Sequence, residues 1–240
     1  MKNLKLLCIH GIGGKDASMN IKGGWGDQWK TAFNSMGFTS SANIELMRFD
    51  SFFNDENADW SDYWDFFQIT FRNKREQKSL DMYFFDNYPD MVVEFLLNKD
   101  GVREKLREEL KKKIEEENPD VIYAHSLGSM MCYDFFTQPE NSTQYKDIIL
   151  VTAGSQLGNP KLRNHSLKQP VEMLPVKFWY NLNNSKDSVF ARHEIVLPSN
   201  KNYKEVSTDF FGKSMGHDGL EYLNHSNAIK NVWNQIKNNY

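Results

Sequence analysis

The order of the expected elements indicates an α/β protein with a doubly wound, mostly parallel sheet of about six strands. Short apolar and β-branched runs alternate with longer amphipathic stretches along the whole 240-residue chain. Strands and helices that alternate in this way form one parallel sheet with right-handed crossovers. We expect strands at 4–9, 44–49, 121–123, 147–152, 176–182 and 203–207.

The stretches between these runs carry the 3.6-residue periodicity of amphipathic helices. The clearest case is 102–117, which is highly charged but places Leu106, Leu110 and Ile114 at four-residue spacing on one side. That stripe predicts a helix with one buried face and one solvated face. The expected helices cover 25–36, 102–117, 127–136 and 220 to about 236.

Length and composition favour one domain that covers 1–240, because no repeat or linker divides the chain. The net charge is −3 and basic residues are dispersed, which gives no indication of a nucleic-acid surface. Cys8 and Cys132 fall in an expected strand and helix, as is typical of buried free thiols in a reducing compartment. The first apolar run is too short for a signal peptide or a membrane span, so we expect a cytoplasmic protein with no integral membrane segment.

The stretch 51–98 is dense in aromatic residues interleaved with acidic ones. We expect an inserted pair of helices or a lid here. An aromatic lid would cover an apolar substrate, and Phe52, Phe53 and Trp60 are its candidate substrate contacts. The alternatives are that these rings hold the insertion against the core or form a dimer contact.

Ser126 lies where the strand 121–123 turns into the helix 127–136, within Ala124-His125-Ser126-Leu127-Gly128. Small residues on both sides of a serine at such a corner are typical of a nucleophile elbow, where the helix N-terminus favours developing negative charge. The alternative is an ordinary turn with a helix-capping serine. Ser155 is a weaker candidate, because no helix is expected behind it.

The first strand ends in a glycine-rich loop, His10-Gly11-Ile12-Gly13-Gly14. Glycines let the backbone approach a ligand closely. The spacing fits neither of the common phosphate-binding glycine patterns. A His-Gly dipeptide after a strand is common in the oxyanion loop of serine hydrolases, so we favour that function over an ordinary turn.

A serine nucleophile needs a base, and the base needs an orienting carboxylate. Among the six histidines, His217 leads because it lies in a glycine-rich loop directly before the last helix. Asp187 leads among the acids because it follows the strand 176–182. The other candidates are the histidines and acids at His10, His125, His165, His193, His225, Asp209 and Asp218.

Four segments together resemble the α/β-hydrolase superfamily, on its lipase and esterase side. They are Cys8-Ile9-His10-Gly11-Ile12-Gly13, Ala124-His125-Ser126-Leu127-Gly128-Ser129, Trp179-Tyr180-Asn181 with Lys186-Asp187-Ser188-Val189, and Gly216-His217 with Leu220-Glu221-Tyr222-Leu223. The resemblance spans most of the chain except the aromatic insertion. Ala124 departs from the glycine that is usual before the elbow.

The resemblance implies an α/β-hydrolase fold with Ser126 as nucleophile, His217 as base and Asp187 as its orienting acid. It implies an oxyanion hole from the backbone N–H groups of Leu127 and of Ile12 or Gly13. The expected reaction is hydrolysis of a small-molecule carboxylic ester, acyl or lipid-like, through an acyl-enzyme, without metal or cofactor. A thioesterase, amidase or acyltransferase with the same triad, or a non-catalytic binding protein of this fold, are the alternatives.

Overall fold

The computed structural model describes residues 4–11, 22–38, 40, 43–53, 90–159, 167, 170–187, 194–195, 197, 201–212 and 216–239. Most of the predicted insertion, from 54 to 89, lies outside these residues. The same is true of Ile12 and Gly13 in the predicted oxyanion loop.

Six parallel strands form one sheet in the described part of the chain, as predicted. They are β1 (Leu6–Ile9), β2 (Ile44–Met47), β3 (Val121–His125), β4 (Ile149–Ala153), β5 (Phe178–Asn183) and β6 (Tyr203–Ser207). Their order across the sheet is β2-β1-β3-β4-β5-β6. Every residue of β1, β3 and β4 is buried, which explains why these strands are continuous apolar runs.

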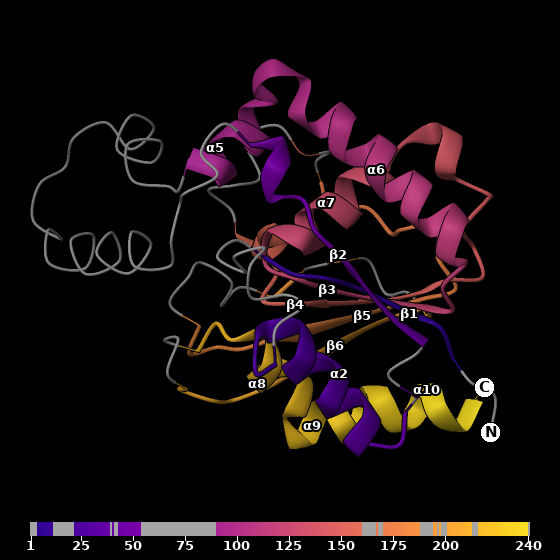
Figure 1. Cartoon of the computed structure of the whole chain (residues 1–240), viewed down its shortest axis with the longest axis vertical. Helices are drawn as coiled ribbons and strands as arrows, with labels where there is room; N and C mark the ends of the chain where they lie inside the picture. Colours follow the sequence, from indigo (N-terminus) through magenta and orange to yellow (C-terminus); the bar gives the residue numbers. More distant parts are fainter. Residues whose placement is uncertain are drawn as a thin grey trace, which may run out of the picture.

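Helices cover both faces of the sheet (Figure 1), which confirms a doubly wound α/β arrangement. One face carries α5 (Asp90–Leu97), α6 (Val102–Glu117) and α7 (Leu127–Phe136). The other carries α2 (Trp25–Ser35), α8 (Gly219–Asn224), α9 (Ser226–Ala228) and α10 (Asn234–Asn239). The single-turn elements are η2 (Asp50–Phe52), η3 (Lys99–Gly101), η4 (Pro139–Asn141), η5 (Gln156–Gly158) and the π-helical η7 (Ile229–Trp233).

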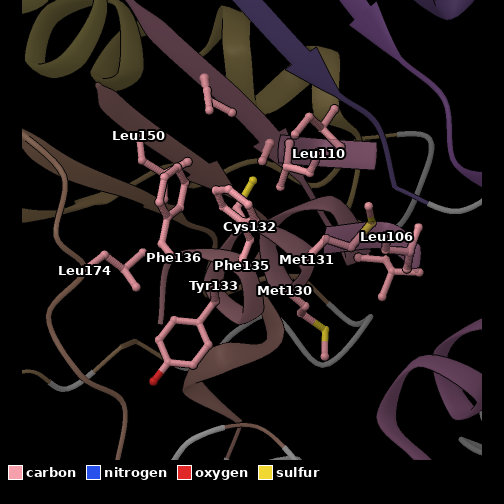
Figure 2. Close-up of a cluster of buried hydrophobic side chains, with 14 of the residues drawn as sticks. Leu106, Leu110, Met130, Met131, Cys132, Tyr133, Phe135, Phe136, Leu150 and Leu174 are labelled. Atoms are coloured by element: carbon pink, nitrogen blue, oxygen red, sulfur yellow. The ribbon is translucent and has the colours of Figure 1, made fainter. Parts of the chain in front are cut away.

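The larger core lies between the sheet and the α5–α7 layer. Figure 2 shows Leu106 and Leu110 of α6 with side chains of α7, together with Leu150 of β4. The stripe predicted on α6 is buried at Leu106, Leu110 and Ile114. All residues of α7 are buried, so this helix is enclosed between α6 and the sheet and holds its N-terminus firmly at the end of β3.

The chain reverses its direction across the sheet between β1 and β3. From β1 it crosses to the β2 edge, and it then returns to the other side of β1 and continues outward through β6. The connections that leave β1 and β3 therefore diverge to opposite faces. Sites of doubly wound proteins lie at such a switch point, beyond the carboxyl ends of the strands. Here those ends carry Gly11 and Ser126.

The prediction of one continuous C-terminal helix is wrong. α8 ends at Asn224, and His225 adopts an extended conformation (φ −62°, ψ 137°) before α9 begins. The π-helical turn η7 then precedes α10. His225 Nδ1 accepts a hydrogen bond from the backbone N–H of Asn227 (3.2 Å) and so caps α9, because the broken helix needs a second N-cap.

A polar network, buried at Thr152 and Asn181 and half-buried at Tyr203 and Glu205, joins β4, β5 and β6. The Thr152 hydroxyl donates to Asn181 Oδ1 (2.7 Å), and Asn181 Nδ2 donates to Glu205 Oε1 (2.8 Å). The Tyr203 hydroxyl donates to the other oxygen of Glu205. Burial raises the pKa of Glu205 from 4.5 to about 7, although these hydrogen bonds act in the opposite direction.

This pKa makes the stability of the fold dependent on pH. Between pH 4.5 and 7 the folded chain binds a proton at Glu205 that the unfolded chain releases, so stability falls as pH rises through this window. We expect Glu205→Gln to abolish that fall, a difference of about 3 kcal/mol between pH 4 and pH 8. Urea unfolding across this range measures it. Glu108→Gln, on the exposed side of α6, is the control; equal pH slopes for native protein and Glu205→Gln would contradict the prediction.

Candidate active site

Ser126 occupies a strained corner between β3 and α7. Its φ of 54° and ψ of −125° are unusual for a residue with a side chain. The backbone is held there because its N–H donates to Ala153 O (2.9 Å) and the following helix is buried. The Ser126 side chain makes no capping hydrogen bond to α7, so the alternative of a helix-capping serine does not describe this residue.

Two glycines allow the loop after β1 to approach this corner. A Cβ atom at Gly11 would lie 2.4 Å from Ser126 Cβ and 3.0 Å from its Oγ. A Cβ atom at Gly128 would lie 2.9 Å from the backbone oxygens of Ile9 and His10. The N–H groups in the first turn of α7, which begins at Leu127, have no acceptor within the helix. The corner therefore offers backbone donors beside the Ser126 hydroxyl.

His217 connects Ser126 to Asp187. Its Nε2 lies 2.9 Å from Ser126 Oγ, and its Nδ1 lies 2.6 Å from Asp187 Oδ2. Both His217 and Asp187 are fully buried, and Ser126 is 4% exposed. The structure thus brings together the three residues that the sequence analysis placed first. An imidazole held between a hydroxyl and a carboxylate in this way can accept the hydroxyl proton during nucleophilic attack.

Tyr222 is a member of this cluster that the sequence analysis missed. Its hydroxyl donates to Asp187 Oδ2 at 2.7 Å, so that oxygen receives two hydrogen bonds. Burial and the neighbouring Asp187 raise the pKa of Tyr222 well above its ordinary value, so the hydroxyl keeps its proton. The sequence analysis named Tyr222 only within the segment Leu220-Glu221-Tyr222-Leu223 that carries the resemblance, without a role of its own. A tyrosine in the first turn after His217 was the available signal.

Asn184 joins the loop of the acid to the loop of the base. Its Nδ2 donates to the backbone oxygens of Gly216 and Phe210, each at 2.9 Å. Its backbone oxygen accepts from the Asp187 N–H at 3.0 Å. Gly216 (φ 81°) and Gly154 (φ 57°) adopt left-handed conformations. A Cβ atom at Gly216 would lie 2.9 Å from Asn184 Nδ2, and one at Gly154 would lie 2.9 Å from His217 Cε1. The site is therefore fitted tightly around the His217 ring.

The other acidic candidates have local structural roles. Asp218 caps α8, since its Oδ1 accepts from the backbone N–H groups of Leu220 (2.8 Å) and Glu221 (3.3 Å). Asp209 accepts from the Ser185 hydroxyl at 2.8 Å. Among these three acids in the described residues, Asp187 is the one that hydrogen-bonds to His217.

The other serine and histidine candidates lie elsewhere or serve other contacts. Ser155 is buried and its Oγ accepts from the Leu157 N–H at 3.4 Å, in the turn η5. His10 Nδ1 lies 2.9 Å from Gly11 O, and its ring packs on Trp25 at 4.6 Å. Burial lowers the pKa of His10 to about 4, so it is a neutral ring at neutral pH. Two further histidines, His165 and His193, lie outside the described residues.

The predicted lid contacts are only partly described. Phe53 is buried in the core beside α6, and Phe52 packs against the same core. Trp60 lies outside the described residues, so contact of these rings with a substrate stays a prediction.

Three findings concern metal sites, cysteine chemistry and membrane-spanning helices. Within the described residues, no group of three or more His, Cys, Asp or Glu side chains is placed to hold a metal ion. Cys8 and Cys132 are buried and free, and burial raises the pKa of both thiols. None of the described helices is both long enough and apolar enough to span a bilayer.

The chain matches no family model, and no curated protein matches it. The class of protein is therefore defined by the fold and the geometry alone. It is a doubly wound α/β protein with a buried hydrogen-bonded chain of Ser126, His217 and Asp187 at the carboxyl edge of its sheet.

Proposed function

We propose that this protein is a serine hydrolase with an α/β-hydrolase fold that cleaves carboxylic esters through an acyl-enzyme. The observation that carries the proposal is the chain of hydrogen bonds from Asp187 through His217 to Ser126 Oγ, at distances of 2.6 and 2.9 Å. The strained conformation of Ser126 supports it, because strain of this kind persists where a function requires it.

In the acylation step, Ser126 Oγ attacks the ester carbonyl carbon while His217 Nε2 takes the hydroxyl proton. The carbonyl π electrons move to the oxygen and form a tetrahedral oxyanion. When the oxyanion collapses, the bond to the leaving alcohol breaks and His217 returns its proton to that alcohol. In deacylation His217 removes a proton from water, the resulting hydroxide attacks the acyl carbon, and the proton then goes to Ser126 as the acid leaves.

Backbone N–H groups stabilise the oxyanion in this scheme. We assign this role to Leu127 and to either Ile12 or Gly13. The close approach of Gly11 to Ser126 supports this assignment, because it places the start of that loop beside the nucleophile. One such donor typically lowers the barrier by ~3–4 kcal/mol.

Tyr222 and Asn184 are positioning residues in this proposal. Two hydrogen bonds to Asp187 Oδ2 hold this carboxylate directed at His217 Nδ1. The side chain of Asn184 ties the backbone at Gly216 to the acid loop, so the base cannot move without the acid. The proposal keeps the prediction of a lid within 51–98 over an acyl or lipid-like substrate, which rests on the aromatic content of that stretch of the sequence.

The test is covalent labelling with a fluorophosphonate, read by intact mass. We expect one adduct on the native chain and none on Ser126→Ala, because only an activated serine attacks the phosphorus. Ser155→Ala is the matched control and should label as the native chain does. Panels of esters, thioesters and amides on the unlabelled native protein would then separate the hydrolases that share this triad.

Absence of an adduct on folded native protein, at any fluorophosphonate chain length, would reject the hydrolase. The non-catalytic binding protein of the same fold would then be favoured. Transfer of the acyl group to an added alcohol in preference to water would instead show an acyltransferase.

A further inference from the structure

His125, the residue before Ser126, is a buried histidine with no role in the scheme above. Its side chain is 1% exposed. Neither ring nitrogen makes a hydrogen bond of normal geometry within the described part of the chain. A buried polar ring without a well-formed hydrogen bond is costly, so its presence requires a reason.

The ring of His125 packs against two other imidazoles. Its centroid lies 4.8 Å from that of His217, with the ring planes inclined by 43°, and 5.5 Å from that of His10. A Cβ atom at Gly219 would lie 3.0 Å from His125 Cγ, so the chain at the start of α8 closes tightly over the ring. The His125 ring thus lies between His10, in the loop after β1, and His217.

The hydrogen bonds of His217 leave its ring faces unsupported. Both of its nitrogens point along one line, from Asp187 to Ser126. These two bonds do not prevent the ring from tilting about that line, and only packing can do so. The Cε1 edge fits against Gly154, and His125 is the imidazole packed nearest to the His217 ring.

We propose that His125 is a positioning residue whose ring packs against His217 and holds it in line between Asp187 and Ser126. The catalytic importance of this packing rests on the proposed function. The hydrogen bond between His217 Nδ1 and Asp187 Oδ2, which the packing would maintain, can be observed without any substrate.

The chemistry of His125 suits this task. Burial, followed by the neighbouring His217 and His10, lowers its pKa well below 6.5, while the nearby backbone of His217 acts in the opposite direction. The ring is therefore neutral at neutral pH. A neutral ring beside His217 adds no like charge when His217 takes the proton of Ser126, whereas a lysine or arginine at this position would.

The experiment compares His125→Ala, His125→Leu and His125→Phe in the full chain. Two quantities are measured for each: the far-downfield NMR resonance of the His217 Nδ1 proton, assigned by its loss in Asp187→Ala, and the rate of fluorophosphonate labelling. His225→Ala is the control, because this histidine caps α9 and its ring lies near Phe210.

Phenylalanine restores a flat ring, whereas alanine and leucine do not. We expect His125→Ala and His125→Leu to lose or broaden the downfield resonance and to label about 10- to 100-fold more slowly, as a small misplacement of a catalytic group does. His125→Phe should keep the resonance and label nearly as fast as the native chain. Leucine keeps most of the volume, so it remains informative if alanine does not fold.

Two results would overturn the proposal. One is a native resonance and native labelling in folded His125→Ala or His125→Leu. The other is a loss in His125→Phe as large as in His125→Leu, which would mean that the nitrogens and not the ring are required. If the native chain shows the resonance but is not labelled, the proposed hydrolase function is rejected and the positioning role of His125 is not. The resonance in the three variants would then still decide that role.

Discussion

Asp187→Asn is expected to lower the rate of ester hydrolysis about 10⁴-fold, with the chain still folded. In the native structure Asp187 Oδ2 accepts hydrogen bonds from His217 and from Tyr222. An asparagine amide that donates to Nδ1 would favour the imidazole tautomer with its proton on Nε2, which cannot take a proton from Ser126. The rate of labelling and the kcat for a p-nitrophenyl ester both measure the loss.

Two isosteric variants are matched controls for this substitution. Asp209→Asn and Asp218→Asn change carboxylates close to the site that bond to Ser185 and to the first turn of α8. Asparagine is also a good N-cap, so α8 should persist in Asp218→Asn. A larger loss in either control than in Asp187→Asn would show that the orienting acid is misassigned.

Gly11→Ala is expected to slow labelling by about 100-fold, because displacement of a reacting group by an ångström costs about that much. The added Cβ would lie 2.4 Å from Ser126 Cβ, which no relaxed structure allows. Ser126 lies in a backbone corner held by Ala153 O and a buried helix, so the loop after β1 has to move away. The backbone donors that the proposed function assigns to this loop would then be displaced from the nucleophile.

Gly101→Ala separates this effect from a loss of stability. Gly101 also disfavours a side chain, since its φ is 69°, but an added Cβ would meet only Glu104 Oε2, at 3.6 Å, at the start of α6. We expect this variant to lose about 1–2 kcal/mol of stability and to label at the native rate. If Gly11→Ala labels as fast as Gly101→Ala, the loop after β1 has no part in the reaction.

Much of the fold could be predicted because its signals are local. The bounds of α6, α7 and β6 agree with the prediction at both ends. In α6 the reason is a clear stripe at four-residue spacing, and in the sheet it is the burial of both faces of the central strands. The C-terminal helix was mispredicted because its break at His225 and its π turn coincide with contacts to other elements, which leave no mark on the periodicity. Asn227 Nδ2 donates to Ser207 O of β6 at 3.0 Å, and the Trp233 ring lies 5.1 Å from that of Phe33 in α2.

The residues of the site were predictable as candidates because each follows the end of an expected strand, and parallel strands end at one edge. The positioning roles that we propose for Tyr222, Asn184 and His125 were not predictable, since their contacts join segments far apart in the chain. The Tyr222 hydroxyl meets a carboxylate 35 residues away, while its sequence position is indistinguishable from that of a core residue.

The alternation of elements, the parallel sheet and a short set of candidate site residues could all be predicted from local sequence patterns. The folded chain was needed to show which histidine and which carboxylate line up with Ser126, because that choice depends on distances between the loops after β3, β5 and β6. It also decided that two glycines are needed for close approach and that His125 faces His217. Periodicity records which face of an element is buried, but not which side chain of another element lies against it.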